Sequence, residues 1–318
     1  MRFAIALSVL CLASTARAES ISETRSLLPP IQIGALIVTP IIATGGVMAK
    51  GDVLVLDEAF SKQLVDISEH DVMDVSNLTI SNKSDRPLFV LSGEVVIGGK
   101  QDRIIGANTV IPAKTTQDVP VFCVEHGRSS GTTNVFTTAK ALAHGRLRAN
   151  ASYRDQDHVW AEVSAMNQVR QTQNTTDTYR VIASQQTNGT IAPQQKKLAA
   201  ALAKIGADDR KRMVGYVVAL DGKVVTVDMF GSNALFAKLE DKLVKSYLTE
   251  AIDLKPTAAN QAPTAKTVKT FMADSAKAKV EKAHETKAAT TTIQRGSYSS
   301  NSSVDSSLGN LYRNYNSM

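Results

Sequence analysis

The first half of the chain alternates short apolar runs with turn-forming residues. Between residues 31 and 126 the runs are rich in Val, Ile, Thr and Phe, as in "IQIGALIVTPII", "VSNLTISN" and "VPVFCVE", and Gly, Pro, Asn and Asp separate them. Such runs predict β-strands. The helix-like stretch that interrupts them, "LDEAFSKQL", is short, so we expect the strands to pair in antiparallel fashion, as a sandwich or an open barrel.

The pattern changes to irregular and then helical between residues 127 and 195. After a glycine-containing basic stretch, "DQDHVWAEVSAMNQVRQ" has apolar residues at helical spacing. This spacing predicts a helix whose buried face carries Val159, Val163, Met166 and Val169. Asp155 and Asp157 stand at its expected start, where negative charge complements the helix dipole. We treat residues 127–195 as a connector.

Residues 196–254 predict a helix–hairpin–helix unit. "QKKLAAALAKIG" is a helix that stops at Gly206, and "GYVVALDGKVVTVDMF" is a hairpin whose turn is Asp221-Gly222, a strong short-range hairpin signal. In the helix that follows, the buried side is expected to carry Leu235, Leu239, Leu243, Tyr247 and Leu248. The fold class is therefore α+β, with a β-rich N-terminal half followed by this unit.

Both ends of the chain differ from this central region. Residues 1–18 have a basic start, a short apolar core and a final "ARA", which together predict a signal peptide cleaved after Ala18 and hence an exported protein, periplasmic or secreted. The apolar core is too short to span a membrane, which takes roughly 20 residues. Residues 255–318 are rich in Ala, Lys, Ser and Thr and are read either as disordered or as a helix plus an edge hairpin.

Composition narrows the class of protein. After removal of the signal peptide, Cys123 is the one cysteine left, so stability must come from a hydrophobic core and not from an internal disulfide. The formal charge of +6 falls to +4 when Arg2 and Arg17 are removed with the signal. Such a small excess argues against a nucleic-acid-binding protein. No spacing of Cys, His, Asp and Glu indicates a metal site, and we expect no cofactor.

Two motifs resemble a known family. "LSGEVVIGGKQDRII" is followed by "IPAKTTQDVPVFCVEHGR", and "GYVVALDGKVVTVDMFGSNALFAKLEDKLVKSYLTEAI" stands further along. Together they resemble the ARG and rhodanese-phosphatase-associated protein domain family over residues 31–254. The family has no established activity, and its name records gene neighbours. The resemblance implies a link to ADP-ribose or NAD-derived metabolites. One departure is that Ser129 and Ser130 stand where the family has an aromatic residue.

The first motif supplies the candidate ligand-binding residues. Cations after a double glycine, together with backbone N–H groups, can converge on an anion such as a phosphate or carboxylate. If the segment is an extended strand, Gln101 and Arg103 face one side and Lys100 and Asp102 the other, unless a bulge at Gly98-Gly99 redirects the chain. The alternative is an internal polar network in which Arg103 pairs with Glu94 or Glu125. The candidate residues are Glu94, Lys100, Gln101, Arg103, Glu125 and Arg128.

Other residues that could carry chemistry are expected to have structural or solvent-exposed roles. Cys123 is more often a small buried hydrophobe than a nucleophile, and its neighbour His126 points to the other side of the strand. Asp228 in "DMF" is expected to cap the next helix or close a turn, and Trp160 is expected in the core. The basic residues of the connector are expected to form a solvated loop, in preference to a binding surface; they are Arg128, Lys140, Arg146, Arg148 and Arg154.

Three hypotheses for function follow. The preferred one is an exported, non-catalytic domain that recognises a ligand or partner, with an anionic, nucleotide-derived small molecule such as ADP-ribose or NAD as the ligand. The second is a hydrolase acting on such a ligand, with Glu94 or Glu125 as general acid or base. The third is a cell-envelope structural or assembly protein whose C-terminal segment pairs with a protein partner by strand addition. No catalytic motif was found, so the sequence leans away from an enzyme.

Overall fold

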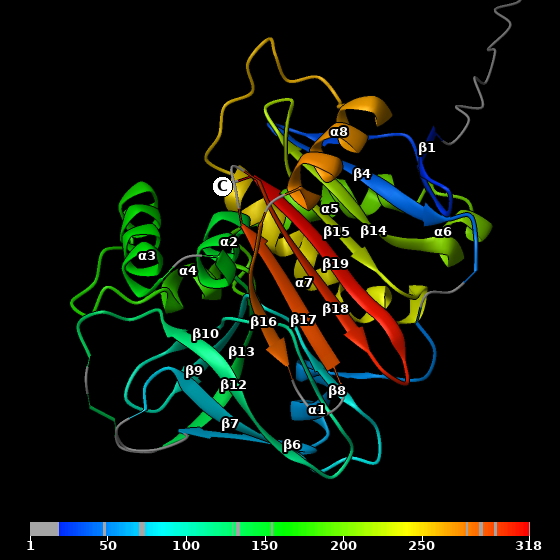
Figure 1. The fold of residues 1–318 in the computed structure, drawn as a ribbon. Helices are drawn as coiled ribbons and strands as arrows, with labels where there is room; N and C mark the ends of the chain where they lie inside the picture. Colours follow the sequence, from blue (N-terminus) through cyan, green and yellow to red (C-terminus); the bar gives the residue numbers. More distant parts are fainter. Residues whose placement is uncertain are drawn as a thin grey trace, which may run out of the picture.

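A computed structural model describes most of the chain. It covers residues 19–317 apart from 47–48, 70–73, 129, 132–133, 154, 278, 286–288 and 296–297. The expected signal peptide therefore lies outside the described residues. Figure 1 shows a large twisted sheet next to a smaller β-barrel, with helices on both faces of the large sheet.

The large sheet combines strands from the N-terminal, middle and C-terminal parts of the chain. Its strand order is β1-β2-β4-β14-β15-β19-β18-β17-β16, with β3 added on β4, and all of its pairings are antiparallel. Its strands are β1 (Glu19–Ser22), β2 (Arg25–Leu27), β3 (Ile31–Ile33), β4 (Leu36–Ala43), β14 (Met213–Leu220), β15 (Lys223–Phe230), β16 (Lys279–Glu285), β17 (Ala289–Arg295), β18 (Tyr298–Asp305) and β19 (Gly309–Ser317).

A closed barrel is built from the N-terminal β-rich region together with one strand, β13, of the predicted connector. Its order is β10-β12-β7-β6-β13-β9. Its strands are β6 (Val65–Glu69), β7 (Asn77–Asn82), β9 (Glu94–Gly98), β10 (Arg103–Ile105), β12 (Thr116–Cys123) and β13 (Val135–Leu142). Alternate residues of β7, Leu78 and Ile80, are buried, because a strand that closes a small barrel turns every second side chain to the interior. A small sheet of β11 (Thr109–Ile111), β8 (Leu88–Val90) and β5 (Leu54–Val55) adjoins it.

The helices lie around these sheets. They are α1 (Leu56–Ser61), α2 (Gly145–Tyr153), α3 (Gln156–Arg170), α4 (Arg180–Gln185), α5 (Ala192–Leu202), α6 (Ala207–Arg212), α7 (Asn233–Ala251) and α8 (Ala265–Ala276). The large sheet lies between α8 and α7 (Figure 1). The α+β class with a β-rich N-terminal half is confirmed. No helix among the described residues combines the length and the apolar character needed to cross a membrane.

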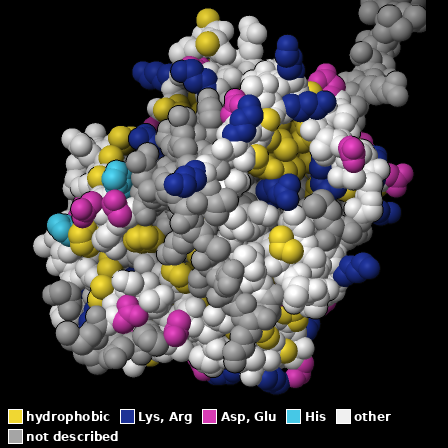
Figure 2. Space-filling view, in the orientation of Figure 1, with side chains coloured by type: hydrophobic (Ala, Val, Ile, Leu, Met, Phe, Trp, Pro, Cys, Tyr) yellow, Lys and Arg dark blue, Asp and Glu magenta, His cyan; other side chains and the backbone are white. Residues whose placement is uncertain are grey.

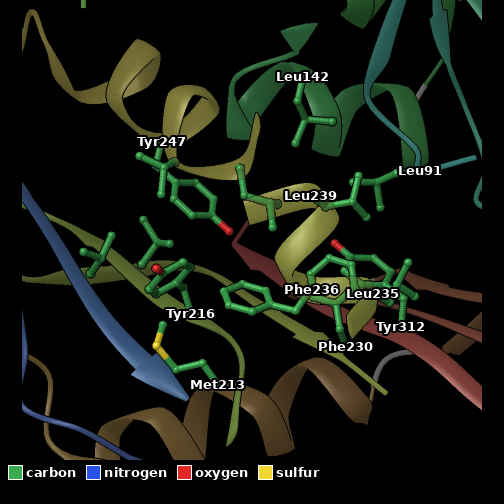
Figure 3. Packing of buried hydrophobic residues seen from close by; sticks show 14 of the residues in the cluster. Leu91, Leu142, Met213, Tyr216, Phe230, Leu235, Phe236, Leu239, Tyr247 and Tyr312 are labelled. Carbon is green, nitrogen blue, oxygen red and sulfur yellow. The ribbon is translucent and has the colours of Figure 1, made fainter. Parts of the chain in front are cut away.

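The principal core lies between α7 and the large sheet. Ser232 caps the helix by accepting a hydrogen bond from the backbone N–H of Leu235. The predicted apolar side of this helix is buried, and Figure 3 shows Leu235, Leu239 and Tyr247 packed beside Tyr216 of β14 and Tyr312 of β19. Burying a large apolar side chain contributes about 1.5–3 kcal/mol to stability, so this interface anchors α7 on the sheet.

Local predictions in the second half are largely confirmed. The hairpin of β14 and β15 turns at Asp221 and Gly222, whose φ values of +48° and +80° suit a two-residue turn. α3 begins after Asp155, whose side chain caps it, and it buries Val159 and Val163. The placement of Val169 on the buried face is wrong, because Asn167 and Arg170 continue the buried face in the last turn of α3 and the Val169 side chain is 62% exposed. Trp160 is half-buried and contacts the ring of His126.

The C-terminal segment forms regular structure. Residues 265–276 form α8, and the strands that follow extend the large sheet. β19 lies inside the sheet, between β15 and β18, while β16 is the last strand in the order. Because β19 pairs directly with β15 of the central hairpin, the end of the chain contributes to the core of the protein.

Candidate functional site

The candidate residues that follow the double glycine lie in a turn at one end of the barrel. β9 ends at Gly98 and β10 begins at Arg103, so the residues between them are not in a strand. The expectation that they alternate across an extended strand is therefore wrong. Gly98 and Gly99 have φ values of +139° and +49°, and a Cβ on Gly99 would lie 2.4 Å from the ring of Phe136. The two glycines thus allow the chain to change direction, which is the condition named above under which these residues would not alternate across a strand.

Asp102 is the centre of this turn. Its side chain is fully buried and accepts hydrogen bonds from Nε and Nη2 of Arg180, at 2.8 and 2.6 Å. The Thr178 hydroxyl and the Gly98 backbone N–H donate to it at 3.1 Å each, and Nη2 of Arg128 lies 3.4 Å away. A buried carboxylate needs such donors, because desolvation of an unpaired charge is costly.

Glu125 and Arg128 form the second part of the same network. Arg128 donates to Oε2 of Glu125 from Nε at 2.9 Å, its Nη2 lies 2.7 Å from the same oxygen, and its Nη1 donates to the Gly99 carbonyl at 2.7 Å. The backbone N–H of Asp102 also donates to Oε2 of Glu125, at 3.2 Å. Burial acts to raise the pKa of Glu125, but the hydrogen bonds, with that from Arg128 the largest, outweigh it and lower the pKa. Glu125 is therefore a paired carboxylate at neutral pH.

The remaining residues of the turn also have partners inside the protein. Gln101 donates from Nε2 to the Glu125 carbonyl at 2.7 Å. Lys100 donates from its backbone N–H to Glu69 at 2.8 Å, and its Nζ lies 3.5 Å from the same carboxylate. Arg103 is 1% exposed and donates from Nη1 to the Gln101 carbonyl at 2.7 Å. The acidic centre of the network is Asp102, and neither Glu94 nor Glu125 forms an ion pair with Arg103 among the described contacts.

Glu94 belongs to a different network. It is 1% exposed and lies 2.7 Å from Nζ of Lys242 in α7, and that Nζ also lies 2.7 Å from Asp57. Burial raises the pKa of Glu94. Burial lowers the pKa of Lys242, but the charges of Glu94 and Asp57 outweigh it and raise this pKa. The two directions are compatible, because Asp57 keeps Lys242 charged even when Glu94 carries a proton. The structure thus brings together five of the candidate residues and separates the sixth.

Cys123 has the surroundings of a structural thiol. It is 4% exposed, and burial raises its pKa, with the charge of Arg103 opposing the shift. His126 is exposed, His144 is buried against Tyr179 and Glu162, and His158 pairs with Asp155. No group of three or more side chains that could hold a metal ion occurs in the part of the chain that the structure describes. His70, Ser129 and Arg154 lie outside that part.

Arg148 and Asp228, for which the sequence predicted only structural or solvent-exposed roles, meet in a second buried network. Arg148 is 6% exposed and donates to both carboxylate oxygens of Asp228, from Nη1 at 3.3 Å and from Nη2 at 3.1 Å. The solvated-loop interpretation is wrong for Arg148, because α2 directs it into the core. Arg146 also lies in α2 and not in a loop, although its side chain is 75% exposed. Asp228 does not cap α7, since Ser232 does.

The Asp228 network contains residues of the second motif that resembles the family, and Gly93 of the first motif lies against it. Besides Arg148, the donors to its carboxylate are the hydroxyls of Tyr247 and Tyr312 and the amide of Asn314. A Cβ on Gly93 would lie 2.4 Å from Cγ of Arg148, so the glycine makes room for this arginine. Sequence reasoning missed this network and also missed Arg180. One signal was available for Asp228, namely an acidic residue within the apolar strand "VVTVDMF".

Two cavities of the structure lie away from the barrel turn. One of about 680 Å³ is formed by residues of α5, α6 and α7 and the residues joining α5 to α6. Another of about 350 Å³ lies between the β1–β2 hairpin, the end of β15, β19 and α8. A ligand at the barrel turn would therefore contact an outer surface and not the interior of either cavity.

Comparison with known proteins gives the family. A search of curated proteins and a search of solved structures each found no match. The family model described as the ARG and rhodanese-phosphatase-superfamily-associated protein domain matches residues 24–307, which include the barrel turn and the Asp228 network. The match extends beyond the 31–254 region in which the motifs were noticed, into the C-terminal strands. The chain therefore belongs to the ARG and rhodanese-phosphatase-superfamily-associated protein domain family.

Proposed function

We propose that this protein is an exported, non-catalytic domain that recognises an anionic small molecule at the barrel turn. The observation that carries the proposal is the arrangement of Arg128 and Arg180 around Asp102. Both guanidinium groups are held by buried carboxylates, yet their side chains remain 26% and 50% exposed. Their positions are thus set before a ligand arrives, which lowers the entropy cost of binding.

The outer surface of this pair suits an oxyanion. Arg180 binds Asp102 through Nε and Nη2, and its Nη1 is not engaged by that carboxylate. Lys100 is close in sequence and is one-third exposed. Arginine donors in a planar fork match phosphate and carboxylate groups, so an ADP-ribose-like or NAD-like ligand, as the family name suggests, is the class that we propose.

The hydrolase alternative has less support. A general acid needs a proton at neutral pH, and the lowered pKa of Glu125 together with its contacts to Arg128 keeps it ionised. Glu94 has a raised pKa, but it is 1% exposed and is held by Lys242. Neither carboxylate offers a free, accessible group to a substrate.

The assembly alternative retains one supporting feature. Strand addition requires a free sheet edge, and β16 is the last strand in the order of the large sheet. The other strands of the C-terminal segment already pair on both sides within the sheet. We therefore place recognition of a small molecule first.

Thermal-shift and calorimetric titration of the protein with ADP-ribose, NAD, sugar phosphates and dicarboxylates tests the proposal. We expect a ligand from this panel to raise the melting temperature of the wild type and of the control Arg212→Ala, and to bind at least about tenfold more weakly to Arg180→Ala. Arg212 is a suitable control because it makes a surface pair with Asp209. Arg103→Ala is a poorer probe, since Arg103 is buried and its loss would disturb the turn.

Each result decides between the hypotheses. No binding across the panel, or equal binding by Arg180→Ala, contradicts recognition at the barrel turn. A bound nucleotide recovered in cleaved form after long incubation supports the hydrolase. Export is tested separately by cell fractionation and N-terminal sequencing, for which we expect a chain beginning at Glu19; an uncleaved chain in the cytoplasm contradicts it.

A further inference from the structure

A second concave surface is formed by residues from distant parts of the chain. The cavity of about 350 Å³ is lined by the β1–β2 hairpin, by the end of β15, by Met272 of α8, and by Asn310 and Arg313 of β19. Its volume falls within the range of about 300–1,000 Å³ that is typical of small-molecule sites. Figure 2 shows a hydrophobic area below α8 on this face, with Lys and Arg side chains around it.

Strand alternation explains why β19 serves two purposes. Tyr312 and Asn314 face the Asp228 network, on the side of the sheet where α7 packs. Arg313 lies between them in sequence and is paired with Met229 of β15, so both point to the opposite side, toward α8. One face of β19 thus holds the core, and the other presents a cation to the cavity.

Two arginines share this cavity. Arg25 of β2 lines it together with Arg313, and Arg25 is 4% exposed. Burial lowers the pKa of Arg25, and the positive charge of Arg313 lowers it further. Arg25 nevertheless stays protonated, because arginine does not lose its proton in proteins. Arg25 donates from Nη1 to the backbone carbonyl of Thr24 at 2.7 Å, whereas no hydrogen bond or ion pair of Arg313 occurs within the described residues. The positive charge of Arg313 therefore repels that of Arg25.

The rest of the lining is mixed in a way that suits an amphipathic anion. Met229 and Met272 form an apolar wall, and thioether side chains adapt their shape to a bound group. Asn310 adds an amide donor. Glu23 also lines the cavity but is exposed, so its carboxylate can turn toward solvent.

We propose that this cavity binds a small organic oxyanion, a carboxylate or phosphate monoester, between Arg25 and Arg313, with its apolar part against Met229 and Met272. Two like charges in one cavity are stabilised when an anion lies between them, and a guanidinium presents paired donors to either oxyanion. The site is separate from the barrel turn and goes beyond the function proposed above.

The test uses the full chain with phenyl phosphate and benzoate as probes, and with inorganic phosphate and sodium chloride at equal ionic strength for comparison. We expect phenyl phosphate or benzoate to bind in calorimetric titration more tightly than inorganic phosphate. Arg313→Met should bind at least about tenfold more weakly, because a charge-assisted contact is lost. Arg313→Lys should bind with intermediate affinity, Glu23→Gln more tightly, and the control Arg212→Met like the wild type.

The melting temperature of Arg313→Met in the absence of ligand gives an independent readout. If Arg313 serves a ligand, Arg313→Met removes a repulsion with Arg25 and should melt at the same temperature as the wild type or higher. A lower melting temperature, or failure to fold, would show that Arg313 is structural and would overturn the proposal. So would the absence of binding by both organic probes, or binding that Arg313→Met leaves unchanged. The panel for the barrel turn is scored with Arg180→Ala, so the two proposals can fail independently.

Discussion

The guanidinium of Arg148 in α2 and the carboxylate of Asp228 in β15 form a buried two-point ion pair, with N–O distances of 3.3 and 3.1 Å. The two residues lie 80 positions apart in the chain. Their pair joins the helix that follows the barrel to the centre of the large sheet. Since Tyr312 also donates to Asp228, the C-terminal strand is tied to the same point.

Loss of the Asp228 charge should be strongly destabilising. Asp228→Asn keeps the shape of the side chain but leaves Arg148 buried without its counter-charge, which costs about 3–5 kcal/mol in free energy of unfolding. Urea denaturation at neutral pH measures this cost. The matched control is Asp66→Asn, because Asp66 forms an exposed pair with Lys83 and should cost less than about 1 kcal/mol. Equal losses of unfolding free energy in the two variants would show that the buried pair contributes no more to stability than the exposed pair.

The same carboxylate should contribute to acid sensitivity. Burial acts to raise the pKa of Asp228, but the charge and hydrogen bonds of Arg148 lower it below the ordinary value of 3.8. A lowered folded-state pKa gives stability that is fully present above about pH 4 and is lost as the pH falls through the folded value. Urea midpoints measured between pH 7 and pH 2 should fall in acid, and they should fall less steeply for Asp228→Asn. Parallel curves for the two proteins would refute this assignment.

Gly93 should be more sensitive to substitution than its backbone angle alone requires. Gly93 and Gly189 have nearly equal φ values, +95° and +94°, so alanine strains the backbone at both positions by about 1–3 kcal/mol. A Cβ at Gly189 meets nothing within 4 Å, whereas at Gly93 it would lie 2.4 Å from Cγ of Arg148. Gly93→Ala should therefore lower the free energy of unfolding by clearly more than Gly189→Ala. The prediction fails if chemical denaturation finds the same loss for both.

The Glu94–Lys242 pair should behave as a structural unit. Lys242→Met leaves Glu94 buried without its cation and should cost about 3–5 kcal/mol, whereas adding Glu94→Gln should restore part of the loss. A double-mutant cycle by urea denaturation measures the coupling. Lys245→Met on the same helix is the control, since Lys245 pairs with the exposed Asp241. Additive losses for Glu94 and Lys242 would show that the two side chains are not coupled.

Several elements could be predicted because their signals are local. The hairpin at Asp221-Gly222 depends on two adjacent residues that accept positive φ, and the buried side of α7 depends on spacing along one helix. The motifs around Gly93 and Glu125 identified the family without reference to the fold. Each of these features involves residues that are close in sequence.

The side chains around the candidate sites could not be assigned in this way. Arg180 was missed because nothing near it in sequence indicates Asp102, and the turn after Gly99 removed the alternation on which the faces of Gln101 and Arg103 were predicted. Arg25 and Arg313 come from opposite ends of the chain and meet only because β2 and β19 enter the same sheet.

By itself, the sequence determined the central hairpin, the buried side of α7 and the family, and it led to the expectation of export, since these depend on periodic patterns and short motifs. The tertiary structure alone decided which charges are buried in pairs, as for Arg148 and Asp228, and which face a cavity, as for Arg313. The physical reason is that the free energy of a charge depends on its solvent exposure and its nearest counter-charge. Both are set by the order and register of strands that lie far apart in the sequence.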